Sequence, residues 1–144
     1  MGRKGGMRIM ALDMGTKRIG VAVSDELFLT AQGRDTIYRK DPANDLAVIK
    51  KTAEANDVGE IIVGLPINMD GSYGAKAKEV LEFMDGLTRA MNIPVKTWDE
   101  RLTTVQAERT LLEADVSRAK RRKSIDKLAA QIILQSYLDS RKKG

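Results

Sequence analysis

Short apolar runs separated by polar turns dominate the first forty residues. Residues 7–12 (MRIMAL) form an apolar run that ends at Asp13, and residues 19–24 (IGVAVS) form another after the turn Gly15-Thr16-Lys17-Arg18. Apolar runs of this length between turn residues predict buried strands, and their closeness predicts a hairpin. A third strand is expected from about residue 30 to residue 39.

Helical and strand patterns then alternate. Asp41 as N-cap and Pro42 in the first turn begin a helix, whose apolar face carries Leu46, Ile49 and Ala53. The later segments are a strand at 61–63 closed by Gly64, a polar loop at 65–72, a helix at about 73–91, a strand at 94–98, a helix opened by a Thr103–Gln106 capping box and reaching residue 112, and a helix capped by Ser124 that runs to about residue 141. This order predicts an α/β fold in which helices flank a five-stranded mixed sheet.

Composition fits one domain. With 144 residues, 42% hydrophobic and 31% charged, the chain is long enough for a sizeable core, and we expect a single domain over residues 7–144 after a disordered lead-in at 1–6. No apolar run has the length of a membrane span, so we expect no membrane partner. The start MGRKGG lacks the apolar core of a secretory signal, which favours a cytoplasmic location.

The net charge of +5 is concentrated in two clusters. Residues 118–123 hold five cations, among them Arg121 and Arg122, and residues 141–143 hold three more. Since phosphates bind largely through Lys and Arg, the clusters predict a polyanionic partner such as a nucleic acid. The alternative is a solvated loop and a charged tail.

The chain has no histidine and no cysteine. Ser–His and Cys–His nucleophilic sites are therefore excluded, and so is a zinc site of nitrogen and sulfur ligands. Carboxylates remain, and oxygen ligands suit Mg²⁺ or Mn²⁺. Two such ions held by acids from different elements support phosphodiester hydrolysis.

Acids at three places follow this pattern. Asp13 ends the first strand, Asp99 and Glu100 follow the fifth, and Asp126 lies in line with the apolar positions 129, 130, 133 and 137 of the final helix. Because neighbouring strand residues point opposite ways, only one of Asp99 and Glu100 can enter a given site. The alternatives are structural: Asp13 as a turn residue that accepts hydrogen bonds from amides, and the other acids as charges that favour helix N-termini.

Polar and basic residues near these acids are candidate substrate contacts. Thr16, Lys17 and Arg18 could hold a phosphate, or simply form a tight hairpin with exposed charges. Ser72 could bind a phosphate or cap the following helix. The full set of expected substrate contacts is Thr16, Lys17, Arg18, Asn68, Ser72, Arg101, Thr103, Arg121 and Arg122.

Four stretches together resemble the YqgF family, also called RuvX, of RNase H-like nucleases. They are LDMGTKRIGVAVSD at 12–25, VGLPINMDGS at 63–72, DERLTT at 99–104 and SIDKLAAQIILQSYL at 124–138. The resemblance implies an RNase H-like fold with the first strand at the centre of the sheet. It also implies that Asp13, Glu100 and Asp126 are the catalytic acids and the ligands of Mg²⁺ or Mn²⁺.

The same resemblance implies two substrates. One is precursor 16S rRNA, whose 5′ end is processed during ribosome biogenesis, with ribosomal particles as further partners. The other is branched DNA, cut by a Holliday junction resolvase. We expect the rRNA role, and either a monomer or a homodimer.

Two other classes compete with a nuclease. Actin-like ATPases also have the pattern Asp-x-Gly-Thr after a strand, as at residues 13–16, but they close two such domains on ATP and this sequence has the length of one. A ribosome-associated RNA-binding protein without catalysis would be expected to have lost an acid, and all three acids are present.

Overall fold

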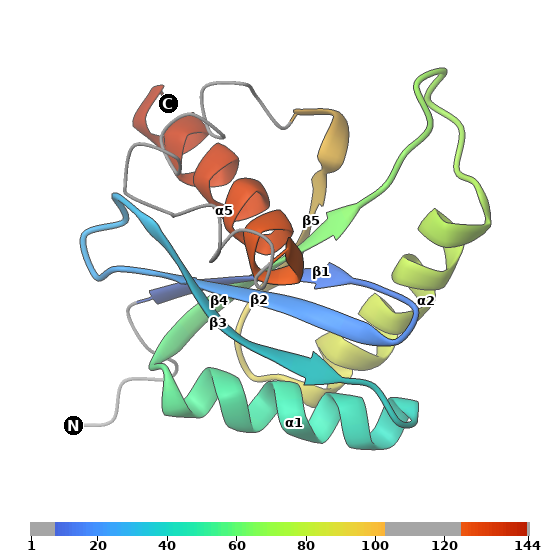
Figure 1. The fold of residues 1–144 in the computed structure, drawn as a ribbon, viewed down its shortest axis with the longest axis horizontal. Coiled ribbons are helices and arrows are strands. Elements are labelled where there is room, and N and C mark those ends of the chain that lie inside the picture. Colours follow the sequence, from blue (N-terminus) through green and yellow to red (C-terminus); the bar gives the residue numbers. More distant parts are fainter. Residues whose placement is uncertain (1–7, 103–124, 144) are drawn as a thin grey trace.

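The computed structural model describes residues 8–102 and 125–143, with side chains described through residue 102 and again from 128 to 141 (Figure 1). The predicted lead-in at 1–6, the helix at 103–112, the Ser124 cap and the basic cluster at 118–123 lie outside the described residues.

One five-stranded mixed sheet forms the centre of the molecule. Its strands are β1 (Arg8–Met14), β2 (Arg18–Ser24), β3 (Ala31–Tyr38), β4 (Val58–Leu65) and β5 (Val95–Asp99), in the spatial order β3-β2-β1-β4-β5. The β1–β2 and β2–β3 pairs are antiparallel, whereas β4 is parallel to both β1 and β5. The predicted architecture, including the central position of the first strand, is therefore confirmed.

Within residues 8–102 and 125–143, three α-helices flank the sheet: α1 (Pro42–Ala55), α2 (Ala75–Ala90) and α5 (Ile125–Lys143). The predicted N-cap of α1 is confirmed, because the Asp41 carboxylate accepts a hydrogen bond from the Asn44 amide at 2.8 Å. The prediction for α2 is wrong at its start. The helix begins at Ala75 with Gly74 as N-cap, so Ser72 lies outside it and does not cap it.

Two strands are longer than the apolar runs that predicted them. Strand β4 begins at Val58 rather than at residue 61, because Gly59 and Glu60 continue the ladder at its polar end. Strand β1 continues through Met14, so Asp13 lies within the strand, opposite Gly20 of β2, and not in the following turn.

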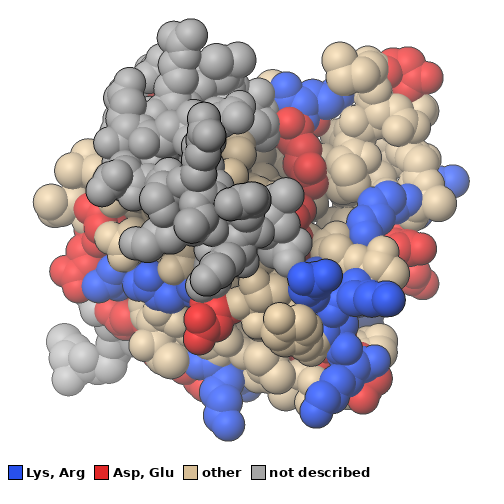
Figure 2. Space-filling view, in the orientation of Figure 1, with Lys and Arg blue, Asp and Glu red and all other residues tan. Residues whose placement is uncertain are grey.

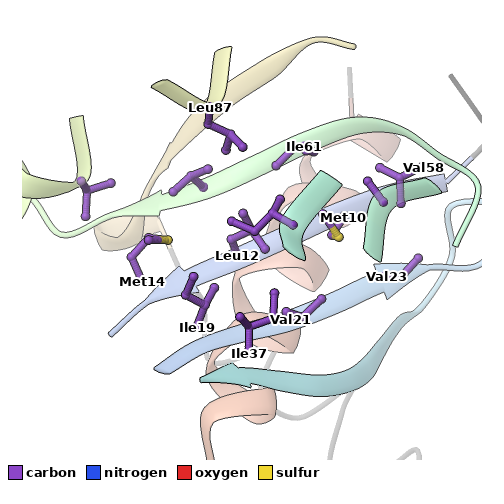
Figure 3. Packing of buried hydrophobic residues seen from close by; sticks show 14 of the residues in the cluster. Met10, Leu12, Met14, Ile19, Val21, Val23, Ile37, Val58, Ile61 and Leu87 are labelled. Carbon is purple, nitrogen blue, oxygen red and sulfur yellow. The ribbon is translucent and has the colours of Figure 1, made fainter. Parts of the chain in front are cut away.

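The two faces of the sheet carry separate cores. The face covered by α1 and α2 packs even-numbered β1 residues such as Met10 and Leu12 against Ile49 and Leu87 (Figure 3). The face covered by α5 packs Ile9 and Ala11 against helix residues such as Ala130 and Leu134. Because strand side chains alternate between faces, Asp13 belongs to the α5 side.

Polar contacts fix the direction in which α5 crosses the sheet. Towards its C-terminus, Tyr137 donates to the Glu60 carboxylate at 2.8 Å, and Arg141 lies 3.6 Å from the same carboxylate, at the beginning of β4. One helical turn before Tyr137, Ile133 lies against Gly64, near the end of β4. The first turn of α5 is therefore directed towards the carboxyl ends of β1 and β4. Within the described residues, no helix is long and apolar enough to cross a membrane.

Candidate active site at the carboxyl ends of the central strands

Asp13 is the acid on the central strand. It is half-buried between the fully buried Leu12 and the buried Met14. Continuing the β1–β4 register from the Leu12–Val63 pair places Asp13 beside Gly64. In the turn that follows, the Gly15 amide donates to the Arg18 carbonyl at 2.8 Å.

Glu100 lies against the same glycine. It follows β5 in a short 3₁₀ helix over Glu100–Leu102, and its carboxylate packs on the backbone of Gly64. A Cβ atom at Gly64 would lie 2.9 Å from Glu100 Oε2 and 2.6 Å from Ile133 Cδ1. The absence of a side chain at Gly64 therefore makes the space that the Glu100 carboxylate occupies beside β1.

The surroundings of Glu100 disfavour its negative charge. Burial raises the pKa of Glu100 above its ordinary value of 4.5, and repulsion from Asp13 raises the pKa further. The positive charge of Lys76, in the first turn of α2, acts in the opposite direction. A cation bound beside Glu100 would offset both the burial and the repulsion from Asp13 that raise its pKa.

Asp99 has a different environment from its neighbour. Both of its carboxylate oxygens accept hydrogen bonds from the Arg101 side chain, at 2.7–3.1 Å, and the Arg101 amide donates a further one at 2.9 Å. The Arg101 guanidinium lowers the pKa of Asp99 below its usual value. Of the two adjacent acids, Glu100 is therefore the one that faces Asp13, and Asp99 holds Arg101.

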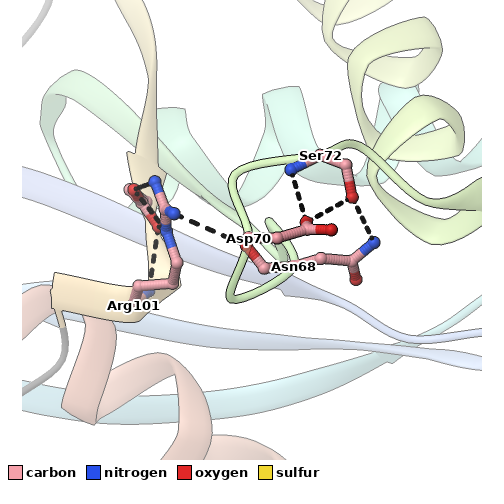
Figure 4. A network of polar contacts seen from close by, with 5 residues as sticks. Asn68, Asp70, Ser72 and Arg101 are labelled. Carbon is pink, nitrogen blue, oxygen red and sulfur yellow. Dashed lines mark hydrogen bonds and ion pairs between the residues drawn. The ribbon is translucent and has the colours of Figure 1, made fainter.

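The loop between β4 and α2 brings together Asn68, Ser72 and Arg101, three of the expected substrate contacts (Figure 4). The Ser72 hydroxyl donates to Asp70 at 2.6 Å and accepts from the Asn68 amide group at 3.0 Å. Arg101 reaches the Asn68 carbonyl at 3.5 Å. These contacts hold the loop as a folded turn beside Arg101, just after the end of β5.

The β1–β2 turn presents Thr16, Lys17 and Arg18 as exposed residues. It is a tight hairpin, in which a Cβ at Gly15 would lie 2.5 Å from the Arg18 carbonyl oxygen. The Gly15 amide is already used inside the turn, so it does not contribute to a phosphate-binding loop. The turn therefore has the geometry of a tight hairpin, and the Lys17 side chain is exposed on it.

Asp126 lies in the first turn of α5, and its side chain is not among those described. The residues that share its helical face do turn towards the sheet, since Ala130 is fully buried and Ile133 is 3% exposed. Thr103, Arg121 and Arg122 lie outside the described residues. In the described part of the chain, no three acidic side chains form a cluster that could hold a metal ion.

Two residues near the site were missed by the sequence analysis. Lys76 is one of several exposed lysines, and only the fold shows that its charge reaches Glu100. Arg39 connects three elements: it donates to the Gly15 carbonyl at 2.8 Å, pairs with the buried Asp45 at 3.1 Å and lies 5.6 Å over the Phe83 ring. Neither role has a local sequence signal.

The donor chemistry of this site fits a hard divalent cation. Asp13 and Glu100 offer partly buried carboxylate oxygens, and both burial and the charge of Asp13 raise the pKa of Glu100. The Gly64 backbone leaves room for the Glu100 carboxylate.

Comparison with curated proteins gives close relatives. A protein of Halothermothrix orenii is 58% identical over 137 residues, which span 95% of this chain and 98% of the relative. A protein of Clostridium botulinum is 54% identical over 93% of this chain and 98% of its own length, and one of Myxococcus xanthus is 54% identical over 93% and 89%. All three bear the name "Putative pre-16S rRNA nuclease".

Solved structures with low sequence identity share the fold. RuvC of Thermus thermophilus, in complex with a Holliday junction substrate, aligns with a TM-score of 0.63 at 13% identity, over 94% of this chain and 96% of that one. The Fowlpox virus resolvase in its junction complex aligns with a TM-score of 0.56 at 16% identity, over 94% and 99%. The expected RNase H-like fold is thus confirmed.

A family profile matches nearly the whole chain. The profile is RuvX, described as "Holliday junction resolvase", and it matches residues 7–140. Together with relatives that are more than half identical over almost their full length, this match shows that the chain belongs to the RuvX family.

Proposed function

We propose that this protein is a divalent-metal-dependent nuclease that processes the 5′ end of precursor 16S rRNA in the cytoplasm. The observation that carries the proposal is the pair of carboxylates, Asp13 and Glu100, brought together over Gly64 at the carboxyl ends of β1 and β4. The names of the close relatives support this substrate. Ribosomal particles would then be the setting in which the protein meets its RNA.

The acids and the cations of the site have different roles. Asp13, Glu100 and Asp126 would hold Mg²⁺ or Mn²⁺, which when bound activates water and neutralises charge on the leaving oxygen. The ion pair with Asp99 fixes the Arg101 guanidinium in orientation, so that it can approach a phosphate with little loss of conformational freedom. Lys76 reduces the electrostatic cost of bringing a polyanion up to two acids.

A second candidate substrate is a four-way DNA junction. The description of the RuvX profile favours it, and two fold relatives were solved with such junctions. The chemistry of phosphodiester hydrolysis at the carboxylates is the same for both substrates, so the substrates themselves must be compared.

The decisive experiment compares cleavage of a precursor 16S rRNA 5′-leader fragment and of a four-way DNA junction, each with Mn²⁺ and with EDTA. We expect metal-dependent cleavage of the RNA, with the junction left intact. Cleavage of the junction alone would assign the protein to the resolvases. Cleavage of neither would favour the non-catalytic RNA-binding alternative.

The metal ligands are tested by Asp13→Asn in the same assay. This change removes one ligand charge and keeps the side-chain volume, so we expect cleavage to be abolished while the fold is retained, as judged by circular dichroism. A fully active Asp13→Asn protein would remove Asp13 from the metal site.

A further inference from the structure

A second surface adjoins the acids on the other face of the sheet. It is a cleft of about 470 Å³ between the beginning of α1, the first half of α2 and the end of β1. This volume lies in the range of about 300–1,000 Å³ that is usual for pockets that bind small molecules or parts of larger ones. Met14, which follows Asp13, lines the cleft together with Lys76, whose charge acts on Glu100. The cleft therefore begins one residue beyond Asp13 on the opposite face of the sheet, and Lys76 connects it electrostatically with Glu100.

The floor of the cleft is suited to a flat ring. It contains the half-buried Phe83 and the guanidinium of Arg39, which lies 5.6 Å from the centre of the Phe83 ring. Arg39 is held in place from two sides, by the Gly15 carbonyl and by Asp45, a buried carboxylate that is 1% exposed. A guanidinium fixed in this way can stack on a nucleobase without losing rotational freedom when the base binds.

The two sides of the cleft have opposite charges, so that one side suits a phosphate and the other suits a base. Lys17, Lys40 and Lys76 are exposed and form no ion pair with any described residue. Figure 2 shows Lys and Arg side chains gathered at the lower right, over the β1–β2 turn and the connection from β3 to α1. On the α2 side, Glu79 and Glu82 line the cleft. They would repel a phosphate, but their oxygens can accept hydrogen bonds from the amino group of a base.

We propose that this cleft binds one unpaired nucleotide of the substrate strand, next to the phosphate that is cut. The base would stack on Phe83 and Arg39, and its phosphate would lie towards Lys76 and Lys17. The proposal rests on the proposed function and deepens it. With such a cleft, the enzyme would select strands in which the nucleotide beside the cleavage point is unpaired.

The test measures binding separately from cleavage. The full-length Asp13→Asn protein binds a fluorescein-labelled single-stranded RNA from the precursor leader, monitored by anisotropy, and the same RNA is prepared with one abasic nucleotide at each position in turn. We expect one or two adjacent positions at which loss of the base weakens binding by at least about fivefold, the lower limit for one stacked base. Adding Phe83→Leu should remove this sensitivity, since the stacking face is then already lost.

Two further variants separate the cleft from general surface charge. Lys76→Ala should weaken binding and lower the slope of log affinity against log salt by about 0.7, the value for one phosphate contact of a single strand. Lys78→Ala, also exposed on α2 but outside the cleft, should leave the abasic pattern unchanged. Both variants alter exposed side chains, so the test holds even if Phe83→Leu fails to fold.

The proposal fails if no abasic position affects binding, if Phe83→Leu keeps the sensitivity, or if Lys76→Ala behaves like Lys78→Ala. Wild-type cleavage of the same RNA with Mn²⁺ is measured in parallel. If the wild type cuts the RNA but binding does not depend on the cleft, the nucleotide-binding proposal alone is wrong. If binding depends on the cleft but no metal-dependent cleavage occurs, the proposed nuclease function is wrong.

Discussion

At the scale of single residues, Asp99 and Glu100 show how neighbours with the same charge acquire opposite properties. Arg101 stabilises the ionised form of Asp99, while burial and Asp13 destabilise that of Glu100. The alternation of strand side chains predicts that only one of them enters the site, but not which one. The choice depends on the contact between Glu100 and Gly64, which joins β4 to the short helix after β5 and which no local pattern encodes.

The raised pKa of Glu100 predicts that Glu100→Gln stabilises the metal-free protein at neutral pH. Below the ordinary pKa of 4.5, Glu100 is protonated in both the folded and the unfolded chain. As the pH rises, the unfolded chain ionises first, so the charged form costs the folded state free energy that is fully present above the raised pKa. The free energy of unfolding in EDTA, from urea titrations, should therefore exceed that of the wild type at pH 7, and the difference should shrink as the pH falls towards 4.5.

Adding Mg²⁺ provides the control for this experiment. A ligand that binds only the folded state raises the free energy of unfolding with its concentration. We expect a larger rise for the wild type than for Glu100→Gln, because the variant lacks one ligand charge. Equal stabilisation of both proteins would contradict the assignment of Glu100 as a metal ligand.

At the scale of elements, the local patterns predicted most elements correctly, and the errors lie at the ends of elements. The apolar runs of β1 and β2 and the cap at Asp41 predicted their elements well. Strand β4 was predicted too short because Gly59 and Glu60 are poor strand formers. Val58 and Glu60 nevertheless pair with β1, and Gly59 lies at the register shift between them. The Ser72 hydroxyl has the chemistry of a cap, but Asp70 and Asn68 bind it within the loop instead.

Gly64 is where three elements meet, and Gly64→Ala should disturb all of them. The new Cβ would overlap Ile133 Cδ1 of α5 and Glu100 Oε2. Overpacking of this kind usually costs about 1–3 kcal/mol. We expect a loss of stability in that range by urea titration, together with a strong loss of cleavage.

Two matched variants make this result specific. Ile133→Val removes the overlapping Cδ1, so in the Gly64→Ala background it should recover part of the stability but not the cleavage, because the overlap with Glu100 remains. Gly86→Ala inside α2 places its Cβ at an ordinary 3.5 Å from Leu46, and should stabilise the protein by about 0.5–1 kcal/mol through helix propensity. If Gly64→Ala were as well tolerated as Gly86→Ala, the close approach of Glu100 would play no part in the site.

At the scale of the whole molecule, the net charge predicts a polyanionic partner, but the fold decides where cations gather. Arg141, from the predicted C-terminal cluster, is paired with Glu60 and packs over the rings of Phe28 and Tyr137, so it helps to attach α5 to the sheet. Lys17 and Lys40 are far from that cluster in the sequence, and the structure places them at the end of the sheet at which β1 ends. Sequence reasoning cannot assemble such a surface because its members come from different elements.

The basic cluster at residues 118–123 leads to a prediction that the described residues do not test. Replacing Arg121 and Arg122 by Ala should weaken RNA binding and lower the slope of log affinity against log salt by about 1.4 for a single strand, at about 0.7 for each phosphate contact. The control is Lys50→Ala with Lys51→Ala, which removes two exposed cations of α1. If the two double variants show the same slope, the cluster is a solvated loop.

The place of α5 in the chain has a consequence for how the protein is made. This helix follows every strand of the sheet in the sequence, yet it packs mainly on β2, β3 and β1, the first strands to be synthesised. Among the helices that the structure describes, α5 is the one that covers the face lined by Ile9, Ala11, Ala22 and Ile62, so this face lacks its helix until residues 128–138 have left the ribosome. The newly made sheet is therefore an aggregation-prone intermediate that needs its last helix or a chaperone. A chain that stops before that helix should aggregate rather than fold into a partly active enzyme.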